Sequence, residues 1–191
     1  MAPPYPVLET ARLRLLLPPP DRAPAVVAYF TRNRDHLERW EPARPEGFYD
    51  EETWRERLRL NREELREGRS LRLFLETREG GRIVGSANFT NIRRGVLHGC
   101  QLGYALDGEE QGKGLMAEAL ERALRHVFEE LELHRVEANY QPTNERSGRL
   151  LRRLGFVVEG YSRDYLFIDG AWRDHVRTAL TRPDPFTPPT P

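Results

Sequence analysis

Lysine and cysteine are almost missing from this 191-residue sequence. Lys113 is the only lysine, so the rest of its 30 basic residues are arginines. Cys100 is the only cysteine, which excludes a disulfide framework and a multi-cysteine metal site and is typical of a reducing compartment. The histidines show no metal-ligand spacing, so we expect no metal site.

Long apolar runs and an excess of charge of one sign are also absent. No apolar stretch approaches the ~18 residues of a membrane span, and residues 1–6 lack the charged-then-apolar pattern of a secretion signal. The 30 basic residues are balanced by 30 acidic ones, so charge gives no reason to expect nucleic-acid binding. We therefore expect a soluble, cytoplasmic protein with no membrane contact and no direct nucleic-acid contact.

A glycine-bearing turn before a long amphipathic helix is the most informative stretch. Residues 111–116 read Gln-Gly-Lys-Gly-Leu-Met and follow an apolar run at residues 102–106. Apolar residues then recur at intervals of three and four as far as Leu131, which predicts a helix with one face in the core. At a helix start, unpaired backbone N–H groups face outward with the positive end of the helix dipole, and glycine lets phosphates approach the backbone. The turn is therefore a candidate phosphate-binding loop.

Two familiar phosphate loops do not fit this turn. No Ser or Thr follows Lys113 as in a Walker A loop, and the third glycine of the dinucleotide fingerprint is missing. An ordinary glycine turn before a helix stays open as the alternative.

Strand and helix patterns alternate on both sides of the loop, and they predict a single α+β domain over residues 1–182. A strand, a helix and a strand around the loop imply a parallel pair in a mixed, mostly antiparallel sheet of about seven strands with about four helices. The expected strands are residues 13–17, 71–77, 82–91, 96–106, 134–140, 165–168 and 172–180, and the expected helices are residues 21–30, 50–68, 115–131 and 144–154. Asp169-Gly170 is a type I′ hairpin signal. The proline-rich residues 183–191 are expected to be a disordered tail.

Residues 34–49 show no regular pattern, and their prolines discourage helix and strand. We interpret them as a surface loop that contacts substrate through Trp40. A helix-to-helix connector with Trp40 in the core is the equally supported alternative.

Several segments together resemble the GCN5-related N-acetyltransferases (GNAT), and within them the RimJ branch, the ribosomal-protein-alanine N-acetyltransferases. The loop fits Gln-x-x-Gly-x-(small or Met), which resembles their phosphate-binding loop, although the family usually has Gly or Ala where this chain has Met116. Further matching segments are Asn139-Tyr140-Gln141-Pro142-x-Asn144-x-Arg146-Ser147-Gly148, Leu154-Gly155-Phe156, Glu159-Gly160-Tyr161, Asp164-Tyr165-Leu166, Ile168-Asp169-Gly170 and Trp172-Arg173-Asp174-His175. The likeness covers residues 8–183, and the segments are specific in combination.

The resemblance implies the GNAT fold and acetyl-CoA as co-substrate. Family members hold the pyrophosphate with the loop backbone, which assigns this role to Gln111, Gly112, Lys113, Gly114, Leu115 and Met116. They lay the pantetheine arm along the preceding strand, which assigns main-chain contacts to Tyr104, Ala105 and Leu106. Their two central parallel strands splay apart, so the N–H of Leu106 is the candidate donor to the thioester oxyanion. The Lys113 side chain either adds charge to the phosphate site or is simply solvated.

The resemblance also suggests catalytic groups, although two usual ones are missing. Many relatives carry a tyrosine beside the leaving thiolate where this chain has Leu151, and some carry a strand glutamate where it has Asn139. Ser147 is the remaining hydroxyl for the thiolate, and Asn144 resembles a cofactor-binding asparagine. Both residues also suit a helix start without further function.

The sequence leaves open which group is the base for the incoming ammonium. Asp164, Glu137 and a water held by Asn139 are the alternatives. The candidate catalytic residues are thus Ser147, Asn139 and Asp164, with Asn139, Asn144 and Ser147 also near the cofactor. Trp40 and Tyr165 are the candidate substrate-binding residues.

The expected reaction is acetyl transfer to the N-terminal α-amine, alanine by resemblance, of a ribosomal protein, with the small ribosomal subunit as a further expected partner. Three other functions stay open: a small-molecule amine acetyltransferase, a ribosome-assembly factor, and a CoA-binding sensor without turnover.

Overall fold

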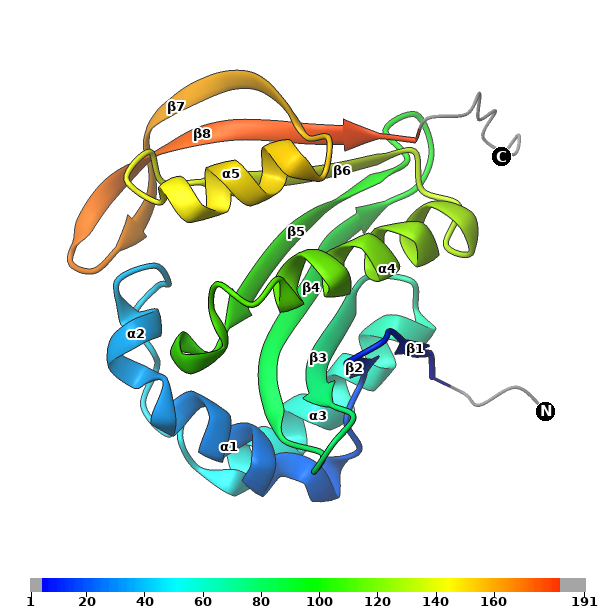
Figure 1. Cartoon of the computed structure of the whole chain (residues 1–191), viewed down its shortest axis with the longest axis vertical. Helices are drawn as coiled ribbons and strands as arrows, with labels where there is room; N and C mark the ends of the chain where they lie inside the picture. Colours follow the sequence, from blue (N-terminus) through cyan, green and yellow to red (C-terminus); the bar gives the residue numbers. More distant parts are fainter. Residues whose placement is uncertain (1–4, 183–191) are drawn as a thin grey trace.

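The computed structural model describes residues 5–182, which form one eight-stranded sheet with helices against both of its faces (Figure 1). The sheet order is β1-β2-β3-β4-β5-β6-β8-β7, and only β5 and β6 pair in parallel. The strands are β1 Val7–Glu9, β2 Leu13–Leu16, β3 Leu71–Thr77, β4 Ile83–Arg93, β5 Gly99–Leu106, β6 Arg135–Tyr140, β7 Val157–Ile168 and β8 Ala171–Thr181. The predicted mixed, mostly antiparallel sheet is confirmed, and the strand beyond the expected seven is β1.

Five α-helices accompany the sheet in the described part of the chain. They are α1 Ala23–Arg32, α2 Arg34–Glu38, α3 Glu51–Arg66, α4 Leu115–Glu129 and α5 Glu145–Arg153, with short 3-10 helices at Pro20–Arg22 and Gly108–Glu110. No helix within residues 5–182 is long and apolar enough to cross a membrane. The expected disordered tail, residues 183–191, lies outside the described residues.

Each face of the sheet has its own hydrophobic core. On one face, the alternate residues Leu71, Leu73 and Leu75 of β3 pack in the cluster that includes the apolar stripe of α4, as its periodicity predicted. Phe74 points the other way, into a second cluster formed by α1, α3 and residue Phe48. The two cores fix α4 and α1 on opposite sides of β4 and β5.

The expectation of an irregular loop over residues 34–49 is wrong at its start, where α2 forms. Leu37 of α2 and Phe48 are buried, and Phe48 contacts Phe30 and Trp54 with ring centroids 5.0 and 5.3 Å away. Trp40 is only partly buried and belongs to neither core cluster, so the alternative that places it in the core is also wrong. The tryptophan that fills this core is Trp54.

The two parallel strands separate after three residue pairs. Their pairing covers Gly99–Arg135, Cys100–Val136 and Gln101–Glu137, whereas β5 continues to Leu106 (Figure 1). The amide of Asp107 donates to Val84 of β4 at 2.8 Å. Since N–H directions alternate along a strand, the amides of Tyr104 and Leu106 face the opposite side, toward the gap. The splay expected from the family resemblance is confirmed.

The hairpin of β7 and β8 extends past the end of β6. The last residue of β6, Tyr140, is paired with Val176, and the hairpin continues from there to its turn at Asp169-Gly170. Both turn residues have positive φ, 51° and 69°, which confirms the predicted type I′ turn.

Candidate functional site

The glycine-bearing loop forms the N-terminus of α4. Gly112 and Gly114 have φ of 76° and 77°, a region that glycine enters without strain, and Gly114 is the N-cap. The first intrahelical hydrogen bond runs from Glu118 N to Gly114 O, 3.1 Å. The N–H groups of Leu115, Met116 and Ala117 therefore precede the helical ladder and remain available to an anion. Ala117 completes this set, which the sequence pattern alone had ended at Met116.

Arg12, in the turn before β2, ties the loop to the first strands. Its Nε lies 2.7 Å from Glu118 Oε2, its backbone N–H donates to Glu118 Oε1 at 2.9 Å, and its Nη1 donates to Lys113 O at 2.9 Å. Burial would raise the pKa of Glu118, but the hydrogen bonds it accepts and the charge of Arg12 outweigh burial and lower it. Sequence analysis missed both residues, because no local pattern reports a pair so distant in the chain.

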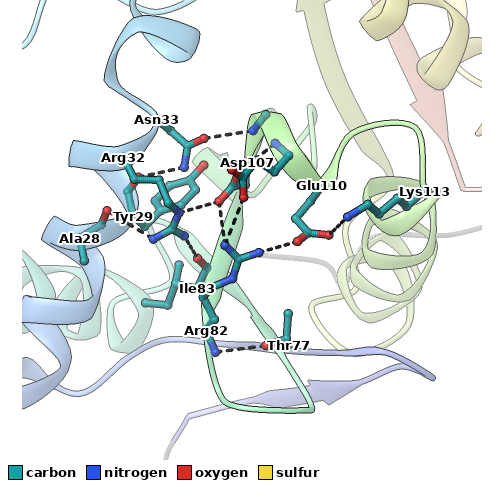
Figure 2. Close-up of polar contacts among 12 residues, drawn as sticks. Ala28, Tyr29, Arg32, Asn33, Thr77, Arg82, Ile83, Asp107, Glu110 and Lys113 are labelled. Atoms are coloured by element: carbon teal, nitrogen blue, oxygen red, sulfur yellow. Dashed lines mark hydrogen bonds and ion pairs between the residues drawn. The ribbon is translucent and has the colours of Figure 1, made fainter.

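A second set of ion pairs holds the segment between β5 and the loop (Figure 2). Asp107, the residue after β5, is 1% exposed and lies 2.7 Å from Arg32 Nε of α1. Arg82 lies 3.7 Å from Asp107 and also binds Glu110, whose other oxygen is 2.9 Å from Lys113 Nζ. Burial opposes the ionisation of Asp107, but hydrogen bonds from Arg32 and the Glu109 amide prevail and lower its pKa. The side chain of Lys113 is thus paired with Glu110 and half-exposed.

The junction of α1 and α2 contacts the same segment. Gly108 N donates to Asn33 Oδ1 at 3.0 Å, and the Gln111 side-chain amide lies 2.9 Å from His36 Nε2 (Asn33 is drawn in Figure 2). The side chain of Gln111 therefore binds α2 through His36.

Tyr104 and Ser147 meet in the splayed part of the sheet. Their hydroxyl oxygens are 2.7 Å apart. Burial raises the pKa of Tyr104 to about 12, although the hydrogen bond with Ser147 acts in the opposite direction. Asn144 is the N-cap of α5, and its Oδ1 accepts from Ser147 N at 3.2 Å. Leu151, for which the family resemblance led us to expect a tyrosine, is 1% exposed and belongs to the core. Sequence analysis assigned Tyr104 through its main chain only, and the contact of its side chain is new.

Asn139 lies on the face of β6 opposite the core residues Val136 and Ala138. Its Oδ1 is buried and has no hydrogen-bond partner within residues 5–182. The neighbouring Glu137 is 3.0 Å from Arg135 Nε and 3.8 Å from Arg177 Nη2. The carboxylate of Glu137 is therefore occupied by arginines, whereas the oxygen of Asn139 is available.

Asp164 lies in an irregular part of β7, where the register shifts between Ser162 and Leu166, and is exposed with φ of 48°. Its N–H donates to Asp174 Oδ1 at 2.8 Å. Within residues 5–182, no hydrogen bond joins it to Asn139 or Ser147. Tyr165 is partly buried against the ring of His175, 5.4 Å between centroids. The structure thus brings Ser147 to Tyr104 but leaves Asp164 on the hairpin.

A cavity of about 580 Å³ opens between α2, residues 43–50 and the β7–β8 turn. Arg34 and Glu38 line it from α2, and Asp169 and Gly170 line it from the hairpin. Trp40 follows α2 but is not part of this lining.

The chain is similar to known acetyltransferases in sequence and structure. The family model for the acetyltransferase (GNAT) domain matches residues 12–157. The ribosomal protein uS5-alanine N-acetyltransferase of Escherichia coli (strain K12) is 46% identical over 181 residues, 95% of this chain and 93% of that protein.

Two solved structures give the same result. The ribosomal-protein-S5-alanine acetyltransferase from Vibrio fischeri has a TM-score of 0.90 and 36% identity, covering 94% of this chain and 98% of that one. The Mycobacterium smegmatis RimJ in complex with CoA-disulfide has a TM-score of 0.84 and 31% identity, covering 93% of this chain and 86% of that one. The chain therefore belongs to the GNAT acetyltransferase family and is an acetyl-CoA-dependent N-acetyltransferase.

Proposed function

We propose that this enzyme acetylates the N-terminal α-amine, an alanine, of a ribosomal protein, and that one domain over residues 1–182 is sufficient. The observation that carries the chemistry is the gap between β5 and β6, which begins after Gln101 and faces the amide of Leu106. The relatives named above, two of them acetyltransferases of a ribosomal-protein alanine, support the acceptor. Such a substrate places the enzyme in the cytoplasm, with the small ribosomal subunit as the partner.

The cofactor's pyrophosphate binds at the N-terminus of α4. The N–H groups of Leu115, Met116 and Ala117 supply donors, and the glycines at 112 and 114 allow close approach. Lys113 leaves Glu110 and turns to the phosphates at small cost, because an exposed ion pair contributes little.

The pantetheine arm extends β5 on the side that β6 leaves unpaired. Main-chain groups of Tyr104, Ala105 and Leu106 hold its amides in the manner of an added strand. This places the thioester beside the N–H of Leu106, which stabilises the oxygen as it becomes an oxyanion.

The acceptor amine enters the gap between β5 and β6 from the face of the sheet opposite the bound cofactor. The ammonium first loses a proton to water, and the neutral nitrogen attacks the thioester carbon. The carbon–sulfur bond breaks with its electron pair on sulfur, and the proton that the nitrogen then carries in excess also passes to water. Asn139 Oδ1, buried and without a protein partner within residues 5–182, accepts a hydrogen bond from the amine or from that water. Ser147 donates a hydrogen bond to the departing sulfur. Asn144 contributes by capping α5, which fixes Ser147 next to the cofactor.

The rest of the acceptor peptide lies between α2 and the β7–β8 hairpin. Trp40 follows α2, Tyr165 and Asp164 lie on the hairpin, and both elements line the cavity of about 580 Å³. We assign Trp40 and Tyr165 to peptide binding, and Asp164 to the electrostatics of the approaching ammonium.

Turnover with purified components tests this function. Release of CoA thiol, measured with an Ala-starting peptide, should exceed release with the same peptide N-terminally blocked by at least tenfold. A sensor would bind CoA without turnover, and a small-molecule enzyme would prefer a free amine such as a polyamine. A ribosome-assembly factor would co-sediment with small subunits even when its turnover is abolished. Any of these results in place of peptide acetylation would contradict the proposal.

A further inference from the structure

The hydrogen bond between Tyr104 and Ser147 spans the gap in the sheet. Tyr104 is on β5, beyond the last parallel pair at Gln101, whereas Ser147 is in the first turn of α5, which follows β6. The two oxygens are 2.7 Å apart. One side of the gap is thus connected to the other by two hydroxyl groups beside the main chain to which the pantetheine arm is assigned.

The chemistry of the two groups favours one direction for this hydrogen bond. Either hydroxyl can donate or accept. A phenol is the stronger acid of the two and hence the better donor, and an aliphatic hydroxyl oxygen is the better acceptor. With Tyr104 as donor, the proton of Ser147 is free to point elsewhere. Burial raises the pKa of Tyr104 to about 12, so the phenol keeps its proton at neutral pH.

Two contacts then determine where the oxygen of Ser147 lies, and the hydrogen bond that this oxygen accepts keeps its own proton away from Tyr104. The backbone of Ser147 is held by the cap, since its N–H donates to Asn144 Oδ1 at 3.2 Å. The remaining freedom is rotation about the side-chain bond, which has three staggered positions. The contact with Tyr104 selects one of them. Neither contact depends on a ligand.

We propose that Tyr104 is a positioning residue that directs the hydroxyl of Ser147 at the sulfur of acetyl-CoA. This rests on the acetyl transfer proposed above. An oxygen that accepts a hydrogen bond polarises its own O–H, which becomes a stronger donor. As the carbon–sulfur bond breaks, Ser147 donates a hydrogen bond to the sulfur that receives the electron pair. The thiolate later takes its proton from water.

Tyr104 itself transfers no proton in this scheme. A cysteine thiol has an ordinary pKa of about 8.5, and a simple alkyl thiol such as that of CoA lies above this value but below that of the buried phenol. A phenol with a pKa of about 12 therefore holds its proton more tightly than the thiolate would. Both hydroxyls begin and end the reaction neutral, and their effect is electrostatic.

The ionisation of bound CoA gives a direct test without turnover. Ultraviolet absorbance of the thiolate is followed for the enzyme–CoA complex between about pH 6 and about pH 10, with the free enzyme subtracted. The pKa of Cys100 is raised to about 12 by burial, so its thiol stays silent in this range. We expect the thiol of bound CoA to titrate at a lower pH than the thiol of free CoA measured in the same buffer. Ser147→Ala should abolish this shift, and Tyr104→Phe should reduce it.

Steady-state kinetics distinguish a positioning role of Tyr104 from a role in packing alone. Tyr104→Phe should lower kcat roughly 3- to 10-fold, the effect of one hydrogen bond, with KM for acetyl-CoA changed less than about twofold. The double variant should match Ser147→Ala alone, because Tyr104 acts through Ser147. Tyr29→Phe is the control: it removes a buried hydroxyl that has no hydrogen-bond partner within the described chain, and it should change neither measurement.

The outcomes distinguish the inference from the proposed function. An effect of Ser147→Ala with none of Tyr104→Phe, or additive effects in the double variant, overturns the positioning role alone. If Ser147→Ala has no effect, Ser147 takes no part in the chemistry and the positioning role of Tyr104 is overturned with it. The proposed function is tested separately, by peptide acetylation with the unaltered enzyme. Should Tyr104→Phe lower the melting temperature, Ser147→Thr decides: the hydroxyl at position 147 should retain the thiol shift and most of kcat when Tyr104 is present, and should lose them to the same extent as Ser147 does when Tyr104→Phe is added.

Discussion

The guanidinium of Arg12 binds the carboxylate of Glu118 across 106 positions of sequence, with 2.7 Å between Nε and Oε2. The same guanidinium holds the carbonyl of Lys113 at 2.9 Å. Because the C=O and N–H of one peptide unit point in opposite directions, this contact turns the N–H of Gly114 away from Arg12. The bend before β2 thereby orients the loop that we propose binds the cofactor.

Removal of Arg12 should therefore weaken CoA binding more than it slows the reaction. Arg12→Ala frees the Lys113–Gly114 peptide to rotate, and we expect the Kd for CoA to rise roughly 3- to 10-fold, the loss of about one hydrogen bond, with little change in kcat. Calorimetry measures the first and saturation kinetics the second. Arg59→Ala, which breaks an exposed pair with Glu56 on α3, is the matched control and should change neither. A fall in kcat at unchanged Kd would contradict this role.

The loop glycines give a second prediction. Gly114 has φ of 77°, which valine tolerates poorly, and it stands where the phosphates approach. Gly114→Val should raise the Kd for CoA at least tenfold, whereas Lys113→Ala should raise it less than about threefold because its charge is exposed.

Gly80 is the control for backbone strain, with φ of 79° and open space around it in the β3–β4 turn. Gly80→Val should lower the stability to a similar extent and leave CoA binding unchanged. Equal losses of affinity from Gly114→Val and Lys113→Ala would refute the backbone assignment.

Acid should weaken the fold through Asp107. Hydrogen bonds from Arg32 and the Glu109 amide outweigh burial and lower its pKa. A carboxyl with a lowered pKa stabilises the folded state above its unfolded value, near 4, and this contribution is lost as pH falls through the folded-state value. Asp107→Asn should cost roughly 1.5–3 kcal/mol at pH 7, the value of a charged hydrogen bond, and the difference from the unaltered protein should shrink toward pH 3. Urea unfolding at several pH values measures it, and a constant difference would disprove the linkage.

The glycine loop and the helix after it could be predicted because both are local. Their signals are the spacing of glycines and a three-and-four repeat within α4, which require no knowledge of distant residues. The five-residue helix α2 could not be predicted, because about one and a half turns are too short to show a helical repeat of apolar residues. The prolines at 42 and 45 also suggested a loop. The three residues of β1 were missed for the same reason.

The partners inside the site depend on tertiary structure. Nothing near Ser147 in the sequence indicates Tyr104, and nothing near Asp107 indicates Arg32. The family resemblance supplied the splay and the role of the loop. The residues alone left Trp40 with two alternatives, a substrate-contacting loop or the core, and the structure removes the second because Trp54 fills the core beside α1.

The last prediction concerns the kind of amine, and it follows from the scarcity of bases near Asn139. The oxygen of Asn139 can accept a hydrogen bond but not a proton, and Glu137 is held by Arg135 and Arg177. A free α-amine has a pKa of roughly 7.7–8.0 and a lysine ε-amine about 10.4. At about pH 7.5, roughly a quarter to two fifths of the α-amine is neutral, against about one part in a thousand of lysine, a difference of about 3–4 kcal/mol.

A site without a strong base can use the first amine and not the second. The enzyme should therefore acetylate an Ala-starting peptide at its N-terminus and leave an internal lysine unmodified, as located by mass spectrometry. The apparent rate should rise with pH up to about 8, following the α-amine, and then level off. Asn139→Asp introduces the missing carboxylate and should extend activity to lower pH. Acetyl groups found mainly on the lysine, or equal rates with an N-terminally blocked peptide, would show that a base is present and that the acceptor assignment is wrong.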